Sequence, residues 1–217
     1  MLRLKLLEAG LIAGAVSFSA SYGYAEEFSA RLSGFNEIGS IPTTVTVTAL
    51  GTPAPTSYTG AVLSNGSGTV TLDLDRNAGT ITYTLTYKNV GVTPPRTGTV
   101  LFAHIHLGKS RDSGGILVFF CTNQSSFTGT GPTPPSCNTD SSGSGTVSGV
   151  WQAANVQAIP GQNVQAGDFD ALVDALTSNT AYANIHTTSG TTPDTGFPGG
   201  EIRGQCHSED REHRENR

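Results

Sequence analysis

The stretch GTVTLDLDRNAGTITYTLTY, residues 68–87, decides the fold class of this chain of 217 residues. Apolar residues occupy every second position on both sides of the short connection 76–79, which ends in a glycine. Alternate side chains of a β-strand lie on the same face, so each half of the stretch has one apolar face and one polar face. The stretch therefore predicts a β-hairpin whose apolar face packs against a core.

Similar strand patterns extend from the hairpin in both directions. The segment 99–107 is apolar on both faces apart from two histidines, which is typical of a central strand covered on both sides. Helical spacing of apolar residues after Asp168 predicts one short helix near 168–177. The chain is therefore expected to be all-β, an antiparallel β-sandwich or a flattened barrel. The other predicted strands lie at 28–34, 43–50, 115–121, 145–151, 181–187 and 200–206.

The two ends of the chain differ from its middle. Residues 1–25 contain Arg3 and Lys5, then an apolar run and then small residues, which is the pattern of an export signal peptide. We expect residues 26–206 to form one domain and the charged residues 207–217 to be a disordered tail. The protein is thus expected to be secreted, periplasmic or held at the cell surface, with no membrane span after the signal is removed.

The charge of the chain argues against nucleic acid as a partner. The net charge is -5, only 13% of the residues are charged, and no cluster of lysine and arginine follows the export signal. Neutralising phosphate groups requires such a cluster. We expect an unidentified extracellular protein or surface ligand as the partner.

Three cysteines are an odd number for an exported protein. A bridge between Cys121 and Cys137 would close a loop of about fifteen residues and stabilise the fold by about 3 kcal/mol in the chain-entropy model. We expect this pairing, which leaves Cys206 as a free thiol or an intermolecular link. A bridge from Cys206 to either of the other two is the alternative.

Three histidines form the candidate site. His104 and His106 alternate along one predicted strand and therefore share a face, and His186 lies on a different strand. Imidazole nitrogens are ligands for copper and zinc, so the three histidines could hold one ion. Glu201 would then be a fourth ligand or a partner that orients an imidazole.

The alternative is a structural polar cluster without a metal, in which the histidines donate to backbone carbonyls. Hydrogen bonds among such buried groups would fix the strand ends and the first strand. Within this cluster we expect Arg203 to pair with Glu37. The sequence leaves both interpretations open. The cluster would consist of Asn36, Glu37, Asn184, Glu201 and Arg203 beside the histidines.

Other metal and catalytic sites are excluded by their residue requirements. Two adjacent metals, as in copper–zinc superoxide dismutase, need about seven ligands, more than this chain supplies. A blue-copper centre usually needs a methionine, and the only methionine is Met1, within the export signal. Neither a Gly-x-Ser-x-Gly nor a His-Glu-x-x-His motif is found, so we assign no catalytic residues and expect a protein that is not an enzyme.

Several segments together carry a resemblance to a known family. From about Phe28 to Cys206 the chain resembles a CHRD domain, the module named after chordin. The resemblance implies an extracellular, immunoglobulin-like β-sandwich, and a single domain behind an export signal is similar to bacterial members. The segment 121–164 is longer than usual in the family, and Pro42 follows the Asn-Glu pair later than usual. The matching segments are 32–37, 68–87, 103–106, 182–187 and 199–205.

These features predict an exported, non-enzymatic binding or structural module of CHRD type whose ligand is unknown. The alternative is a mononuclear copper- or zinc-binding protein that uses His104, His106 and His186.

Overall fold

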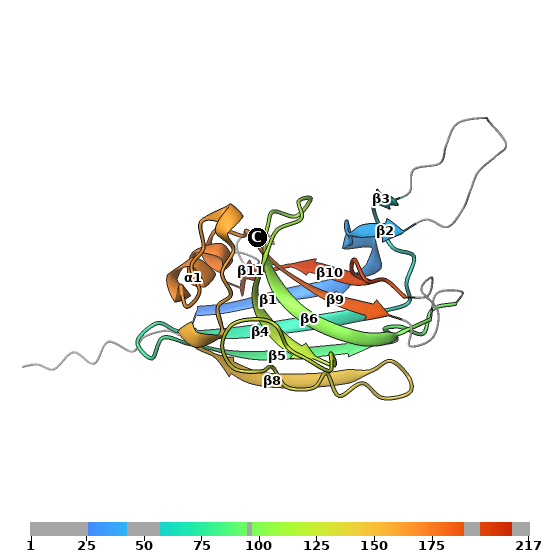
Figure 1. Cartoon of the computed structure of the whole chain (residues 1–217), viewed down its shortest axis with the longest axis horizontal. Coiled ribbons are helices and arrows are strands. Elements are labelled where there is room, and N and C mark those ends of the chain that lie inside the picture. The colour runs from blue at the N-terminus through green and yellow to red at the C-terminus, as the bar shows by residue number, and fades with distance from the viewer. Residues whose placement is uncertain (1–25, 43–56, 95–96, 189–195, 210–217) are drawn as a thin grey trace, which may run out of the picture.

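The computed structural model describes residues 26–42, 57–94, 97–188 and 196–209, and most of them lie in or between β-strands (Figure 1). Threonine, valine, isoleucine and tyrosine alternate along these segments and favour the extended backbone. The strands are β1 (Glu26–Ser33), β2 (Ser40–Pro42), β3 (Ser57–Thr59), β4 (Ser67–Asp75), β5 (Thr80–Lys88), β6 (Thr99–Leu107), β7 (Ile116–Thr122), β8 (Gly145–Trp151), β9 (Ala181–Thr188), β10 (Ile202–Gln205) and β11 (His207–Ser208).

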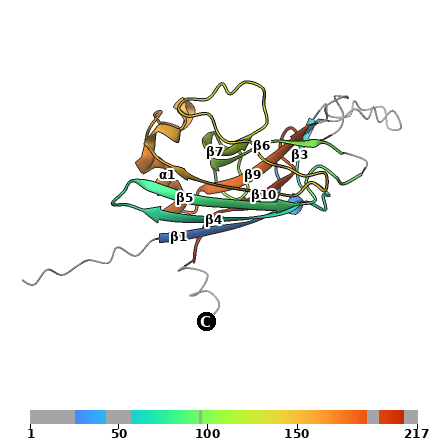
Figure 2. The same ribbon diagram turned by 90° about the horizontal axis from the view of Figure 1, so that it is seen from below.

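One large antiparallel sheet contains all of these strands except β2 and β3, which pair with each other. Its order is β7-β6-β9-β10-β1-β4-β5-β8, and β11 pairs with β1. The sheet curls so that its two edge strands, β7 and β8, come into contact. Trp151 of β8 donates its Nε1–H to the Phe119 carbonyl of β7 at 2.8 Å. Figure 2 shows β1, β4 and β5 in one layer and β6, β7 and β9 in the other. The predicted fold class is confirmed as a nearly closed, barrel-like sandwich.

The hairpin of β4 and β5 supplies much of the core between the layers. Its strands pair from Ser67 with Lys88 to Asp75 with Thr80, without a register shift. The Tyr83 ring stacks on Trp151 with 4.4 Å between the ring centroids. The alternation seen in the sequence therefore translates directly into a buried face. The buried residues of the hairpin are Val70, Leu72, Leu74, Ile81, Tyr83, Leu85 and Tyr87.

A single α-helix among the described residues, α1 (Phe169–Thr177), packs Leu172 and Leu176 into the core and confirms the predicted helix. Its first turn is capped by Asp168, whose carboxylate accepts a hydrogen bond from the Ala171 backbone N–H at 3.1 Å. Short 3₁₀ turns connect other elements. They are η1 (Gly34–Asn36), η3 (Ala153–Asn155) and η4 (Pro160–Gln162).

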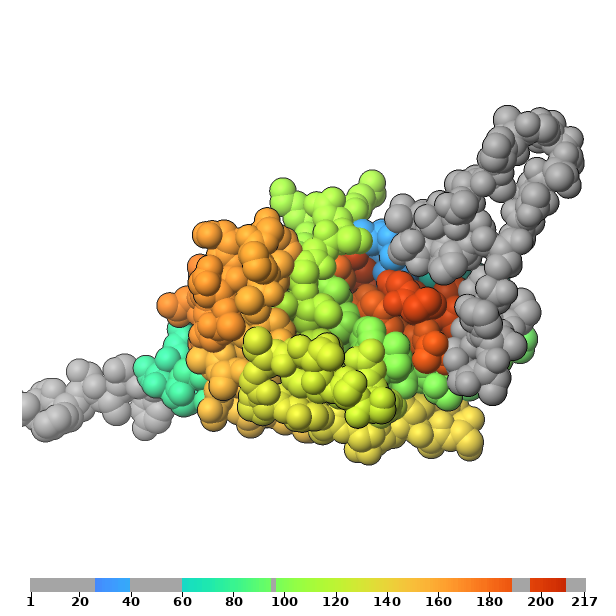
Figure 3. Space-filling view, in the orientation of Figure 1, coloured from blue at the N-terminus to red at the C-terminus, as the bar shows by residue number. Residues whose placement is uncertain are grey.

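The predicted disulfide between Cys121 and Cys137 is present. It ties the end of β7 to the long segment that leads to β8, and Figure 3 shows this segment in yellow-green across the lower front of the molecule. Cys206 is a free cysteine that is buried in the core, and burial raises the pKa of its thiol to about 12. A thiol in this environment is unreactive at neutral pH.

The first residues of the segment expected to be disordered, 207–217, form a short strand. His207 and Ser208 form β11 and pair with Ser29 and Phe28 of β1. Backbone pairing needs free N–H and C=O groups rather than apolar side chains, and this part of β1 offers them because β10 pairs only at Ser33.

Other expectations concern segments that the structure does not describe. The predicted strand at 43–50, the export signal at 1–25 and residues 210–217 lie outside the described residues. Among the described residues, none of the helices is long and apolar enough to cross a membrane.

Candidate metal centre

The three histidines lie on the outer face of β6 and β9. The inner face of these strands carries Ile105 and Ala183, which belong to the hydrophobic core. Opposite each other across the two strands lie Phe102 and His186, His104 and Asn184, and His106 and Tyr182. Alternate residues of a strand share a face, so these six side chains form two adjacent columns with Asn184 in the middle of its column.

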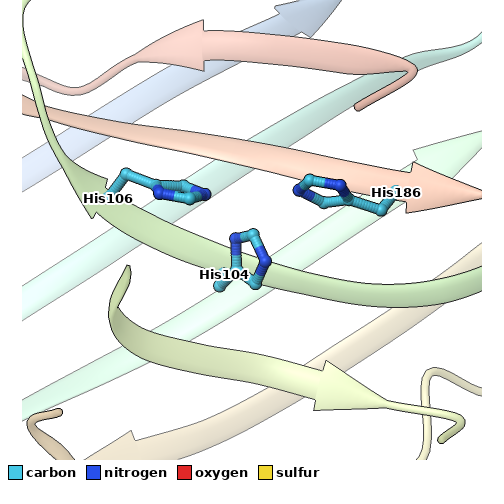
Figure 4. Close-up of side chains that lie close together, drawn as sticks. All are labelled: His104, His106 and His186. Carbon is cyan, nitrogen blue, oxygen red and sulfur yellow. The ribbon is translucent and has the colours of Figure 1, made fainter. Parts of the chain in front are cut away.

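The ring nitrogens of His104, His106 and His186 converge. One nitrogen of each ring lies within 4.8 Å of the corresponding nitrogens of the other two. In Figure 4, His106 and His186 approach each other from opposite sides and His104 stands between them. Nitrogen ligands at about 2.0 Å from one ion lie roughly 3.3 Å apart, so small ring rotations would bring all three to a common ion.

Backbone carbonyls determine the tautomers of two of the rings. The Nδ1 atom of His106 lies 2.8 Å from the Gly114 carbonyl oxygen, and Nδ1 of His186 lies 2.8 Å from the Pro198 carbonyl oxygen. A carbonyl oxygen can only accept, so each Nδ1 carries the hydrogen. In a neutral imidazole the other nitrogen, Nε2, then has a free lone pair, as in a histidine that ligates a metal.

The Nε2 lone pairs meet another acceptor instead of a donor. The Oδ1 atom of Asn184 lies 3.1 Å from Nε2 of His106 and 3.1 Å from Nε2 of His186. Neither ring nitrogen of His104 has a hydrogen-bond partner of good geometry, although both are buried and Asn184 lies close enough to raise the His104 pKa slightly against the effect of burial. A buried polar group without a partner is costly, and several lone pairs directed at one point repel each other. A cation at this point would remove both penalties.

The NH₂ group of Asn184 lies on the side of Glu37, away from the histidines. Asn184 is among the groups that lower the Glu37 pKa, although burial dominates and leaves this pKa raised. The Oε2 atom of Glu37 is buried and has no hydrogen-bond partner of good geometry. Oε1 of Glu37 accepts from the backbone N–H groups of Ile38 and Gly39, at 2.9 Å each. A carboxylate attracts the amide NH₂, which leaves Oδ1 facing the histidines.

Gly200 makes this approach possible. Its φ is +123°, a conformation that residues with a Cβ rarely adopt. A Cβ at this position would collide with the Glu37 carboxylate and would lie 3.0 Å from Nδ2 of Asn184. Glycine at position 200 therefore leaves room for Glu37 and Asn184 to lie close together.

Burial keeps all three imidazoles neutral. The exposed fractions are 1% for His104, 8% for His106 and 7% for His186. Loss of solvation lowers the pKa of His106 and of His186 to about 4. It lowers the pKa of His104 well below the ordinary value, and charge on the other two histidines would lower it further. Neutral imidazole is the form that binds a metal ion.

Aromatic rings enclose the histidines. The Phe102 ring lies 5.0 Å from that of His104 and 4.7 Å from that of His186, measured between centroids. Phe119 of β7 contacts His104 edge to face at 5.3 Å and is itself covered by Phe127 at 5.2 Å. The long segment after β7, flagged in the sequence without an assigned role, thus supplies part of the outer wall through Phe127.

A second stack adjoins the site through Tyr182. Its ring stacks on His106 with 4.7 Å between centroids and an interplanar angle of 7°. The guanidinium carbon of Arg203 lies 3.3 Å from the Tyr182 ring centroid, and Nη2 of Arg203 donates to the carbonyls of Lys109 and Asp112. A fixed positive charge is therefore held one ring away from the imidazoles.

The structure does not bring Glu201 to the histidines. Its carboxylate accepts hydrogen bonds from the Ser64 hydroxyl at 2.7 Å, the Thr187 hydroxyl at 2.8 Å and the Gly91 backbone N–H at 3.0 Å. The Glu201 side chain is fully buried, and both of its carboxylate oxygens accept hydrogen bonds in these contacts. Glu201 is thus neither a fourth ligand nor a partner of the imidazoles.

Two other members of the expected polar cluster are placed differently. Asn36 is exposed in η1, away from the histidines. Arg203 and Glu37 do not form the expected ion pair, because no contact within 4.0 Å joins them among the described residues. They interact only at longer range, and each affects the pKa of the other. Arg203 is instead satisfied by Tyr182 and by backbone carbonyls.

Sequence reasoning missed the residues that hold and enclose the three histidines. Asn184 was expected to be a structural residue, although its spacing of two from His186 already places it on the same face. Phe119 and Phe127 carry no such signal, because their contacts depend on how β7 and the following segment fold over β6. The Gly114 and Pro198 carbonyls are backbone groups that residue types do not reveal.

A comparison with protein families matches residues 28–206 to the CHRD domain. The match covers nearly all of the described residues and includes every histidine of the site. A search of curated proteins found no match to this chain. On the evidence of the family match and the sandwich fold, the chain belongs to the CHRD domain family.

Proposed function

We propose that this CHRD domain is an exported, non-enzymatic module that binds one copper or zinc ion through His104, His106 and His186. One observation carries the proposal: two Nε2 lone pairs, the unpartnered His104 ring and Asn184 Oδ1 converge where no donor is available. An ion at this point would have three nitrogen ligands and an amide oxygen nearby.

A metal-free polar cluster accounts for only part of the same contacts. Such a cluster requires every buried polar atom to have a partner. The hydrogen bonds from Nδ1 of His106 and His186 to backbone carbonyls fit this requirement, but they also fit a metal site, where they fix the ligand tautomer. His104, which has no partner at either nitrogen, favours the metal site.

Export is supported by the composition of residues 1–25 and by the disulfide, which suits an oxidising compartment. A role in binding rather than catalysis is supported by the burial of all three histidines, since a catalytic metal needs an open position for water or substrate. If export occurs as proposed, N-terminal sequencing of the protein from the extracellular or periplasmic fraction should give a mature chain that begins near Glu26.

Elemental analysis tests the metal site directly. The mature chain, purified without an affinity tag and incubated with copper or zinc, should retain about one ion per chain after desalting. The His104→Ala variant should retain less than about 0.1 ion per chain. The matched control is His207→Ala, which removes an exposed histidine of β11 outside the site and should bind like the wild type.

The absence of retained metal in a folded wild-type chain would exclude the proposal and leave the polar cluster. Turnover of a substrate that is lost in folded His104→Ala would instead show that the module is an enzyme.

A further inference from the structure

We propose, on the basis of the metal function above, that the site selects monovalent copper, Cu(I), over Zn(II) and Cu(II). The inference starts from the charge of the ligand set. Within the described part of the chain, the group that could hold an ion consists of three neutral imidazoles, with neither a carboxylate nor a thiolate among them. These neutral ligands therefore cancel none of the charge of a bound ion.

The nearest charged groups do not compensate for a divalent ion. Glu37 stands behind Asn184, where its Oε1 atom accepts from the Ile38 and Gly39 backbone N–H groups and its Oε2 atom is buried without a partner. Arg203 offsets the charge of Glu37, because its own positive charge acts on His106 across the Tyr182 ring. The two side chains leave little net charge near the ion. Glu201 cannot help, since its oxygens bind Ser64, Thr187 and Gly91.

Because the site is buried, the difference in charge between a monovalent and a divalent ion becomes a difference in affinity. The three histidines are at least 92% buried, and Phe102 and Phe119 line them with apolar rings. The electrostatic cost of transferring an ion from water into such surroundings rises with the square of its charge, so a divalent ion pays about four times the cost of a monovalent one. Neutral ligands recover less of that cost than anionic ones would.

Coordination geometry acts in the same direction. Zn(II) favours four ligands in a tetrahedron, and Cu(II) favours a tetragonal arrangement of four or more ligands. Cu(I) has a filled d shell and accepts low coordination numbers. Here the carbonyls of Gly114 and Pro198 hold two of the three rings in place, and the protein oxygen that lies 3.1 Å from both Nε2 atoms belongs to the neutral amide of Asn184, a weak ligand.

Competition titrations of the metal-free mature chain test the selectivity. Cu(I) is titrated without oxygen against a coloured Cu(I) chelator, and Zn(II) and Cu(II) are titrated against their own chelators at the same pH. The same three imidazoles compete with protons for each ion, so the ratio of affinities cancels this effect. We expect Cu(I) to bind at least about tenfold more tightly than either divalent ion.

Equal or tighter binding of Zn(II) or Cu(II) would overturn the selectivity while leaving the metal site intact. No binding of any of the three ions would instead overturn the metal function itself. The two failures are therefore distinguishable.

The Asn184→Asp variant tests the cause. It places a carboxylate next to the ion with almost no change in volume, so it should reduce the ratio of Cu(I) to Zn(II) affinity by at least about tenfold. The control, Asn77→Asp, makes the same charge change at an exposed position of the β4–β5 turn and should leave the ratio unchanged. An unchanged ratio in folded Asn184→Asp would show that charge does not set the selectivity. The wild-type titrations decide the selectivity itself even if this variant does not fold.

Discussion

At the residue scale, the site depends on which way one amide faces. Asn184 presents its oxygen to two imidazoles, and its NH₂ group lies on the side of Glu37. With the amide reversed, the NH₂ group would donate to the same two Nε2 atoms, and His106 and His186 would then have partners at both ring nitrogens. If the proposed metal site is correct, Glu37 would favour this orientation of Asn184 and keep the lone pairs directed at the position of the ion.

The Glu37→Gln variant should weaken metal binding by about 10- to 100-fold without destabilising the metal-free protein. The glutamine oxygen can still accept from Ile38 and Gly39, while its NH₂ group favours the reversed Asn184 amide, which blocks the ion. Affinity is measured by chelator competition and stability by thermal unfolding. The control is Glu27→Gln, an equal charge change at an exposed position of β1. A parallel loss of affinity and stability would indicate a purely structural role for Glu37.

The sequence indicates which residues share a face but not where alternation ends. His104, His106 and His186 could be assigned to one site because each lies inside a regular strand. Glu201 could not be assigned correctly, because it precedes β10 and follows Gly200, whose φ of +123° interrupts the alternation. Its side chain therefore turns toward Gly91 instead of the histidines.

At the scale of elements, β6 matches its predicted bounds, 99–107, because both of its faces are apolar and its ends are clear. Its pairing could not be predicted. Register shifts interrupt the pairing with β7 on either side of His104 and Ile105, and another interrupts the pairing with β9 between Val100 and Phe102. Such bulges arise from the fit between neighbouring strands, which a single sequence does not contain, and they re-aim side chains near sites.

The disulfide fastens the segment after β7 and should contribute mainly to stability. Replacing Cys121 and Cys137 together by alanine should lower the free energy of unfolding by about 3 kcal/mol, because the bridge closes a loop with a sequence separation of 16 residues. Metal affinity should change little, since the ligands lie on β6 and β9.

Chemical denaturation with and without a reductant measures this contribution. The wild type should lose the same stability on reduction, whereas the double variant should not respond to the reductant. A strong loss of metal affinity in the folded double variant would mean that the wall around Phe127 holds the histidines, contrary to this expectation.

At the scale of the whole molecule, three buried neutral bases make stability depend on pH. The pKa values of His106 and His186 are about 4 in the folded protein, against about 6.5 when unfolded. Between these values the unfolded chain binds more protons, so the stability of the metal-free protein should fall as the pH decreases from about 6.5 toward 4. Glu37, whose pKa is raised by burial, acts in the opposite direction but is one group against three.

Denaturation midpoints at several pH values measure this slope. The His186→Gln variant, which lacks one buried base, should show a shallower dependence between pH 6.5 and 4.5. A free energy of unfolding that stays constant over this interval in the wild type would contradict the expected protonation states.

The fold class could be predicted because alternation in the hairpin 68–87 and in the other strands already specifies a two-layered β structure. The order of the strands could not, since many orders bury the same faces. In the observed order the first strand, β1, lies between β4 and the C-terminal strands β10 and β11.

This strand order has a kinetic consequence. Because β1 pairs with β10 and β11, the sheet cannot be completed before these two strands have been synthesised, and folding relies on contacts between residues far apart in sequence. Such folding is slow compared with that of proteins built from local contacts. The histidines depend on the same late step, because His186 lies on β9 and joins His104 and His106 only after β9 has paired with β6.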